Sequence, residues 1–251
     1  MAPHMAPHDA LDKISAWLAD LYGPRLISLV VYGSFANGHQ HNHDPKHSDI
    51  NLLAVLDTVD AHALDQGEPA LAWWIKQGYP PVALLSRDEQ ADSADVFPIE
   101  YLDIHAHHRL LKGDDLFGQA PQLPELHRRQ VEHDLRAKLL RLRAAYIGSS
   151  RDAKALERVL LDSVSTFLTL FRHALAAVGQ PFLVDKEKVL AAAAAHFHFD
   201  AAPFTAILQS RRLPSRLEGG KLEPLRALFA RYLAALSQVE RALEAHPHSH
   251  A

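Results

Sequence analysis

Two short segments of this chain carry residue types that suit phosphate and metal chemistry. Gly33 and Ser34 follow the β-branched run Leu26–Tyr32, and further along a second apolar run opens with Asp49 and Asn51. Glycine lets the backbone approach a ligand closely, and serine offers a hydroxyl and an N–H to phosphate oxygens. Asp49 and Asn51 are two positions apart, so a strand points both to one face, and their oxygens suit Mg²⁺. The pattern predicts a place where a nucleoside triphosphate and its metal are held.

A further carboxylate is expected from the segment Val96–Ile104, which we predict to be a strand. It carries Glu100 and Asp103, which differ by an odd number of positions, so a regular strand would place them on opposite faces. Only one of the two would then join Asp49. Carboxylates on adjacent strands can hold Mg²⁺ ions that bridge the phosphate and the nucleophile.

Histidines gather in two places. The stretch 39–47 predicts either a Zn²⁺ or Ni²⁺ site or a polar, flexible loop beside the active site, and its composition favours the loop. His105, His107 and His108 follow the predicted strand, and either contact with nucleotide or substrate or ordinary surface polarity explains them.

Hydrophobic periodicity divides the chain into two kinds of structure. The first half alternates helices and short strands, whereas the second half shows only helical spacing. The expected strands cover 26–32, 49–56, 81–85 and 96–104, and the expected helices cover 10–22, 61–77, 131–146, 152–178, 186–197, 203–210 and 222–245, with Leu110 and Leu111 near a helix end.

We therefore expect an α/β (α+β) core with a mixed sheet over residues 10–120, followed by an all-α helical bundle over 121–245, with disordered ends at 1–9 and 246–251. The first 121 residues sum to a charge of −10 and the rest to +6. This asymmetry predicts either a metal-binding acidic half and a phosphate-receiving basic half, or two solvated surfaces that happen to differ.

Composition excludes several classes of protein. The chain contains no cysteine, which rules out disulfides, thiolate zinc sites and a cysteine nucleophile. We find no apolar run of membrane-spanning length and no hydrophobic signal core at the N-terminus. We expect a cytoplasmic protein with no membrane partner, and a nucleic-acid partner is not indicated because there is no basic tail.

The two motif segments together resemble a known signature. Gly-Ser after one hydrophobic strand, Ser48-Asp49-Ile50-Asn51 at the start of the next, and a later carboxylate resemble the DNA polymerase β-like nucleotidyltransferase superfamily. The likeness covers residues 10–118 and is greatest to small bacterial members, which include aminoglycoside nucleotidyltransferases and the minimal nucleotidyltransferases of toxin–antitoxin pairs. The resemblance implies Mg²⁺, a nucleoside triphosphate that we expect to be ATP, and transfer of a nucleoside monophosphate to a hydroxyl of a small molecule or protein.

The resemblance also assigns roles to residues. Gly33 and Ser34 match the nucleotide-binding turn, and Asp49 matches the first metal carboxylate, with a catalytic role. Glu100, between two hydrophobic residues, best matches the third carboxylate, which is both catalytic and metal-binding. Asp103 is the alternative for that third position.

Asn51 departs from the superfamily pattern, because it stands where a second metal carboxylate is expected. Its amide oxygen can still bind Mg²⁺, but it removes one negative charge and cannot bridge two metals. Three outcomes stay open: a one-metal or weakened transferase, a nucleotide-binding or regulatory module that has lost catalysis, or an enzyme that recruits another acid.

The second half of the chain bears on the nucleotide and the acceptor. Lys138, on a basic predicted helix, is expected from the resemblance to approach the triphosphate. A positively charged half suits polycationic aminoglycosides poorly unless local acids such as Glu125, Glu132 and Asp134 line the cleft. The acceptor and the oligomeric state therefore stay open.

Overall fold

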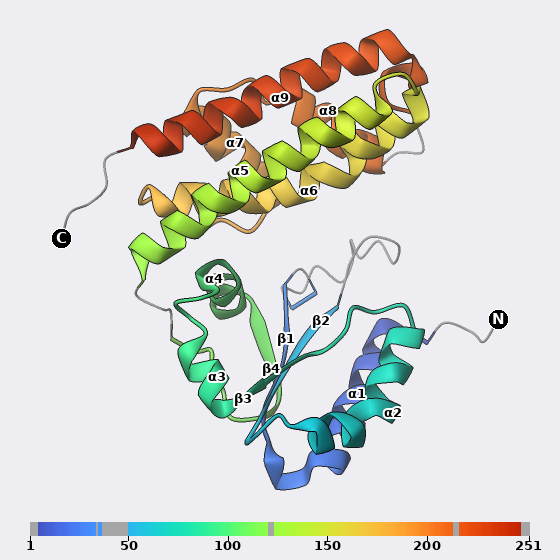
Figure 1. Ribbon diagram of the computed structural model, residues 1–251, viewed down its shortest axis with the longest axis vertical. Coiled ribbons are helices and arrows are strands. Elements are labelled where there is room, and N and C mark those ends of the chain that lie inside the picture. The colour runs from blue at the N-terminus through green and yellow to red at the C-terminus, as the bar shows by residue number, and fades with distance from the viewer. Residues whose placement is uncertain (1–4, 34, 37–49, 120–122, 213–215, 247–251) are drawn as a thin grey trace. The chain divides into compact units, whose positions relative to one another are not determined.

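The computed structural model describes residues 5–33, 35–36, 50–119, 123–212 and 216–246. By its internal contacts the chain divides into two compact units, Met1–Leu123 and Pro124–Ala251. Within the described residues, the first unit contains a sheet with helices and the second contains helices only (Figure 1).

The first unit is built on a mixed four-stranded sheet in the order β3-β2-β1-β4 (Figure 1). β1 (Leu26–Tyr32) pairs antiparallel with both β2 (Asn51–Leu56) and β4 (His108–Gly113), and β2 pairs parallel with β3 (Ala83–Ser86). A mixed sheet of this kind is what the α/β pattern of the first half predicts, so that prediction is confirmed.

The end of β1 lies between the first residues of its two neighbours. Tyr32 is the register partner of Asn51 in β2 and of His108 in β4. The predicted strand at 26–32 is confirmed as β1, which is buried at four consecutive positions, as expected of a central strand with a near-continuous apolar run. The sheet therefore brings three separate parts of the chain together at one end of β1.

One face of the sheet is covered by α1 (Pro7–Tyr22) and α2 (Ala61–Lys76), as Figure 1 shows. Apolar residues at helical spacing on α1 pack against every second residue of β1 and β2. The two helices are also joined by the Tyr22 hydroxyl, which donates to the carbonyl of Ala63 at 2.9 Å. The buried core on this face includes Leu11, Ile14, Leu18, Leu29, Val31, Leu52, Ala54, Leu56 and Trp74.

The opposite face is covered by α4 (Pro98–Ala106). Tyr101 and Ile104 of this helix pack with Val30, Leu53 and Val55 of the sheet. This second core is smaller than the first, and it carries the strand positions that share a face with Asn51.

The predicted strand at 96–104 is wrong, because Pro98–Ala106 form a helix. Pro98 stands in the first turn, where its missing N–H has no intrahelical partner to lose and its fixed φ favours a helix. Pro98, Tyr101 and Ile104 are buried at three-residue spacing, which fits one face of a helix better than one face of a strand.

Two neighbouring elements also differ from expectation. Leu110 and Leu111, expected near a helix end, lie in β4, an edge strand whose residues are exposed or half-buried, so hydrophobic alternation is weak there. The short helix α3 (Arg87–Asp92) was not predicted, although Ser86 and Glu89 form the capping box that starts it.

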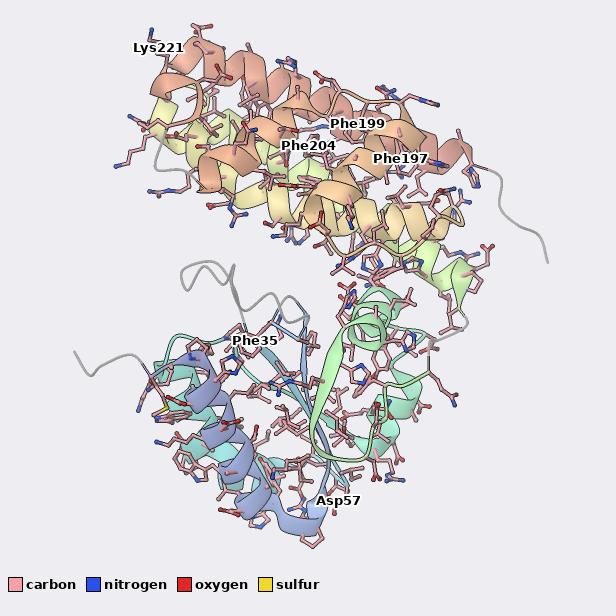
Figure 2. All side chains as sticks on the ribbon, turned by 180° about the vertical axis from the view of Figure 1, so that it is seen from behind. Phe35, Asp57, Phe197, Phe199, Phe204 and Lys221 are labelled. Carbon is pink, nitrogen blue, oxygen red and sulfur yellow. The ribbon has the colours of Figure 1, made fainter. Side chains whose placement is uncertain are left out.

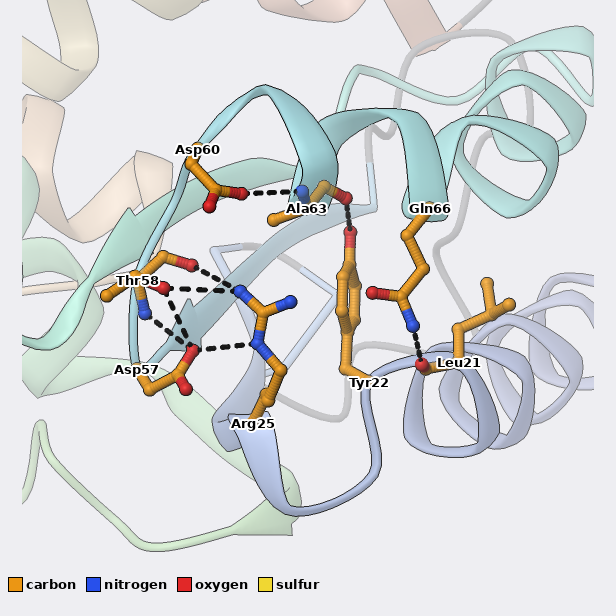
Figure 3. A network of polar contacts seen from close by, with 8 residues as sticks. All are labelled: Leu21, Tyr22, Arg25, Asp57, Thr58, Asp60, Ala63 and Gln66. Carbon is orange, nitrogen blue, oxygen red and sulfur yellow. Dashed lines mark hydrogen bonds and ion pairs between the residues drawn. The ribbon is translucent and has the colours of Figure 1, made fainter.

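At the end of β1 and β2 that is away from Gly33, Arg25 forms a network of polar contacts (Figure 3). Arg25 is the last residue of the 3₁₀ turn Gly23–Arg25. Arg25 Nε donates to Asp57 Oδ1 at 3.1 Å, and Arg25 Nη2 donates to the carbonyl of Thr58 at 3.3 Å. The hydrogen bond from Arg25 and the N–H of Thr58 lower the pKa of the Asp57 carboxyl. Figure 2 shows Asp57 and Phe35 at opposite ends of the unit, so Asp57 is remote from the turn that follows β1.

The second unit is a bundle centred on α6, which contacts each of the other long helices. An aromatic cluster fills its core, with the Phe204 and Tyr232 ring centroids 4.6 Å apart and those of Phe171 and Phe199 5.2 Å apart (Figure 2). Its helices are α5 (Pro124–Ser149), α6 (Ala153–Ala177), α7 (Lys186–Phe197), α8 (Ala202–Arg212) and α9 (Leu222–Ala245), with a 3₁₀ turn at Leu217–Gly220.

Several buried polar groups join the helices of this bundle. The Glu157 carboxylate accepts from the N–H of Leu217 at 2.7 Å and from Arg216 Nη2 at 3.1 Å, which ties the 3₁₀ turn to α6. His127 Nε2 and His173 Nδ1 lie 3.0 Å apart and join α5 to α6. These bonds offset the cost of burying polar atoms, so they define how the helices pack.

Within the described residues, one helix, α6, is long and apolar enough to cross a membrane by length and composition. Half of its apolar window is buried inside the bundle, and the core helix of a soluble protein meets the same criterion. The feature is weak evidence for a membrane span, and the absence of a membrane partner stays a prediction from the sequence.

Gly67 of α2 packs so closely on α1 that a Cβ there would lie 2.0 Å from the Tyr22 hydroxyl. We expect Gly67→Ala to destabilise the first unit, because overpacking costs about 1–3 kcal/mol. That cost exceeds the gain in helix propensity of about 0.8–1.0 kcal/mol. Urea unfolding followed by circular dichroism measures the difference.

Gly148 of α5 is the matched control, because a Cβ there would meet nothing within 4 Å. Gly148→Ala should raise the free energy of unfolding by roughly 0.4–1 kcal/mol, since alanine restricts the unfolded chain. A Gly67→Ala variant that is as stable as Gly148→Ala would contradict the close packing of α1 on α2.

Candidate functional site

The turn after β1 is shaped by Gly33, whose φ is +82°. This left-handed conformation costs an L side chain roughly 1–2 kcal/mol, so glycine is favoured here. The N–H of Gly33 donates to the carbonyl of His107 at 3.1 Å, and the N–H of Ala36 donates to the carbonyl of Gly33 at 3.2 Å. The turn is thereby fastened to the residue that precedes β4.

Asn51 lies directly against this turn. A Cβ added to Gly33 would lie 3.2 Å from Asn51 Nδ2, which is tighter than an ordinary contact. Strand alternation places Asn51 on the same face as Leu53 and Val55, the face that α4 covers. The structure therefore brings together two of the residues that the sequence singled out, Gly33 and Asn51.

Helix α4 presents Glu100 and Asp103 on one side, because residues three apart on a helix are neighbours. The expectation that only one of the two could join Asp49 assumed a strand, and the helix removes that assumption. Partial burial raises the pKa of the Tyr32 phenol, and the nearby charges of Glu100 and Asp103 raise it further. Tyr32 is the register partner of Asn51, so these charges act on the residue paired with Asn51.

The sequence analysis did not identify Tyr32 as the strand partner of Asn51. It also did not place Glu100 and Asp103 on one side of a helix. Tyr32 directly precedes Gly33, and its position at the end of a central strand was the available signal. For Glu100 and Asp103 the signal was Pro98, which is typical of the first turn of a helix.

The histidines in the last turn of α4 and just after it make polar contacts with the segment that follows β4 and with the glycine turn. His108 Nε2 lies 2.9 Å from Asp115 Oδ1, and His105 Nδ1 lies 3.0 Å from the carbonyl of Phe117. Burial raises the pKa of the Asp115 carboxyl, but the N–H of Phe117 and the His108 imidazole outweigh this and lower it. The carbonyl of His107 accepts the hydrogen bond from the N–H of Gly33.

Several predicted features lie outside the described residues. These are Ser34, Asp49 and the histidine-rich stretch 39–47. Their roles as nucleotide-binding residue, catalytic metal ligand and loop remain predictions from the sequence.

The donor types at this end of the sheet suit Mg²⁺. Asn51 offers an amide oxygen, and Glu100 and Asp103 offer carboxylates, all of which are hard oxygen ligands. In the part of the chain that the structure describes, no group of three or more His, Cys, Asp or Glu side chains is placed to hold a metal.

Lys138 belongs to the second unit. It lies on α5 between the buried residues Leu135 and Leu139 and is half-buried. Its approach to a nucleotide remains a prediction from the sequence.

The mixed sheet with its glycine turn and the helical unit that follows in the chain form an α/β core and a helical region. In particular, the chain is similar to the structure of spectinomycin adenyltransferase AAD(9) from Enterococcus faecialis with ATP and spectinomycin. The match has a TM-score of 0.55 and 11% identity and covers 95% of this chain and 100% of that one. At this identity the likeness shows the fold.

Other comparisons are weaker. A toxin–antitoxin structure with AMP-PNP matches 41% of this chain and 74% of its own at 21% identity, with a TM-score of 0.28. A mutant of the toxin–antitoxin pair MntA-HpeT matches the same shares at 18% identity and the same TM-score. No protein-family model and no curated protein sequence matches this chain.

We expect Gly33→Ala to weaken ATP binding at least about tenfold, which corresponds to about 1.4 kcal/mol. The added Cβ meets Asn51 Nδ2 and strains the turn that would approach the phosphates. Isothermal titration with ATP measures the affinity.

Gly23→Ala is the matched control, because Gly23 also has a positive φ, of 51°, and a Cβ there meets nothing within 4 Å. Both variants should lose roughly 1–2 kcal/mol of stability to backbone strain. If Gly23→Ala weakens ATP binding as much as Gly33→Ala does, the turn at Gly33 is not the nucleotide site.

Proposed function

We propose that this protein is a Mg²⁺-dependent nucleotidyltransferase that moves a nucleoside monophosphate, AMP first among the candidates, from a triphosphate to a hydroxyl. The observation that carries the proposal is the contact of the left-handed Gly33 turn with Asn51, at the sheet end where the sequence motif predicts the triphosphate. The similarity to AAD(9), whose structure contains ATP and spectinomycin, supports it along 95% of the chain.

The proposed roles follow from the sequence motif and from the turn at Gly33. Gly33 and Ser34 would cradle phosphate oxygens, because a turn without a Cβ lets its N–H groups approach an anion. Asp49 and Asn51 would hold the Mg²⁺, which neutralises charge on the phosphates when bound. Glu100 would accept the proton of the acceptor hydroxyl.

The reaction then needs little covalent chemistry from the protein. The acceptor oxygen forms a bond to the α-phosphorus, the bond to the bridging oxygen breaks, and pyrophosphate leaves. Positioning and charge stabilisation account for most of the rate in phosphoryl-transfer reactions. Lys138, in the net positive half, is proposed to add a charge toward the triphosphate.

The acceptor is proposed to be a small molecule or protein side chain with little positive charge. Two of the acids that would suit a polycation already have partners within the second unit. Glu132 Oε1 accepts from Arg128 Nε at 2.9 Å, and Asp134 Oδ1 lies 2.9 Å from His133 Nδ1. A cytoplasmic location, where ATP and Mg²⁺ are supplied, belongs to the same proposal.

A second candidate function follows from Asn51. Loss of one negative charge at a metal position favours a nucleotide-binding or regulatory module that binds the triphosphate without turning it over. This candidate shares the Gly33 turn with the first and differs only in the chemical step.

We expect Asp49→Asn to lower the rate of pyrophosphate release by at least about 10²–10³-fold, as loss of a charge-stabilising group does at an active site. Release would be measured with each of the four nucleoside triphosphates against a panel of hydroxyl acceptors that includes spectinomycin. Asp65→Asn is the control, because Asp65 is an exposed acid on α2.

The assay also separates the two candidates. Turnover by the wild-type protein that survives Asp65→Asn but not Asp49→Asn supports the transferase and rejects the regulatory module. Firm binding of ATP with no release from any triphosphate and acceptor pair would sink the transferase and favour the module.

A further inference from the structure

Three helices of the second unit meet at the hydroxyl of Ser165. This residue lies on α6, which contacts both α7 and α8, and its side chain is half-buried. The ammonium of Lys186, the first residue of α7, donates to Ser165 Oγ at 3.4 Å. Arg211 Nη1, from the last turn of α8, donates to the same oxygen. Two cationic side chains from different helices therefore converge on one neutral oxygen atom.

The Ser165 hydroxyl is left with a proton to donate. A serine oxygen has two lone pairs and one O–H. When both lone pairs accept from Lys186 and Arg211, the hydroxyl can act toward a further partner only as a donor. Among the residues that the structure describes, no group accepts this proton. The hydroxyl thus favours an acceptor that comes from outside these helices.

Arg211 has more donors than its surroundings use. Its guanidinium carries five N–H groups, and within the described part of the chain its one polar contact is with Ser165. No described carboxylate lies within ion-pair distance of it, whereas Arg231 Nη2 donates to Asp200 Oδ2 at 2.7 Å. A half-buried charge without a counterion is costly, so an anion beside Arg211 would stabilise it.

The donor set around Ser165 suits a phosphate group. Arg211 offers a planar fork and Lys186 a compact point charge, and both kinds of donor bind phosphate oxygens strongly. The Ser165 hydroxyl adds a third donor between them. Donors that come from three helices fit a tetrahedral anion with several oxygens better than a planar carboxylate with two. Two like charges near one oxygen repel each other, and a bound anion would also lower that repulsion.

We propose that Ser165, Lys186 and Arg211 form a binding site for a phosphate group, carried by free phosphate or by a small phosphate monoester. The site belongs to the second unit and goes beyond the proposed function, because none of its residues comes from the Gly33 turn or from the proposed metal ligands. Its test therefore succeeds or fails independently of nucleotide transfer.

The location of binding is tested by titrating the ¹⁵N-labelled full-length protein with inorganic phosphate and, in parallel, with glycerol phosphate. The Nε–Hε signal of Arg211 in the NMR spectrum is assigned by its loss in Arg211→Gln, and we expect it to shift. The signal of Arg231, whose Nε and Nη2 already donate to Asp200, should stay in place. Equal affinities for the two probes would identify free phosphate as a sufficient ligand, and tighter binding of glycerol phosphate would identify a monoester.

The contribution of each cation is measured by isothermal titration with inorganic phosphate. Arg211→Gln should weaken binding at least about tenfold, the lower limit expected when a hydrogen bond to a charged group is lost. Lys186→Gln should weaken it by a similar factor. Arg231→Gln and Lys188→Gln are the matched controls, because each removes the same charge, and Lys188 is exposed on the same helix as Lys186. Neither control should change the affinity.

Each outcome decides the proposal. An Arg211 signal that stays in place at every phosphate concentration that the folded protein tolerates would overturn it. Equal weakening in Arg211→Gln and Arg231→Gln would also overturn it, because that pattern reports net charge alone. If Arg211→Gln does not fold by circular dichroism, the comparison of Lys186→Gln with Lys188→Gln decides in its place. If only Gly33→Ala loses phosphate binding, the phosphate occupies the glycine turn and the proposal fails.

Discussion

The hydrogen bond from the N–H of Gly33 to the carbonyl of His107 joins the parts of the first unit that could do chemistry. It fastens the turn after β1 to the residue between α4 and β4. Because β1 also pairs with β2 on its other side, the same turn meets Asn51. Three segments that are far apart in the sequence therefore share one small region, and its geometry depends on a glycine that can adopt a positive φ.

The two faces of the sheet have different tasks. The face under α1 and α2 holds the larger core, with residues such as Leu18 and Trp74 almost fully buried, and it gives the unit much of its hydrophobic stabilisation. The face under α4 has a smaller core, and it is the face that carries Asn51. A rigid core on one face can hold polar groups in place on the other, which is how sites are commonly positioned on α/β sheets.

Much of this fold could be predicted from the sequence because its main elements carry strong local signals. The strand at 26–32 and the helices at 186–197 and 222–245 have the predicted bounds, since their periodicity and end signals agree. The segment at 96–104 misled because it is short and its apolar residues fit both a strand and a helix. Only tertiary packing of Tyr101 and Ile104 against the sheet decides between them.

The same ambiguity limited what the sequence could say about the site. Gly33 and Asn51 were found from a turn and a strand start, and the structure places them in contact. In the predicted strand, the odd spacing of Glu100 and Asp103 would put the two side chains on opposite faces. In the helix that forms instead, the two residues lie on one side.

We propose above all that the Asn51 end of the sheet holds a triphosphate and its metal. The most direct test is a crystal structure of the protein with Mn²⁺ and an ATP analogue that has a methylene group between its α and β phosphorus atoms, in which anomalous scattering locates the metal. We expect the triphosphate over the Gly33 turn and a Mn²⁺ ion ligated by Asp49 and Asn51. A nucleotide bound elsewhere, or a metal that touches neither residue, would contradict the proposal.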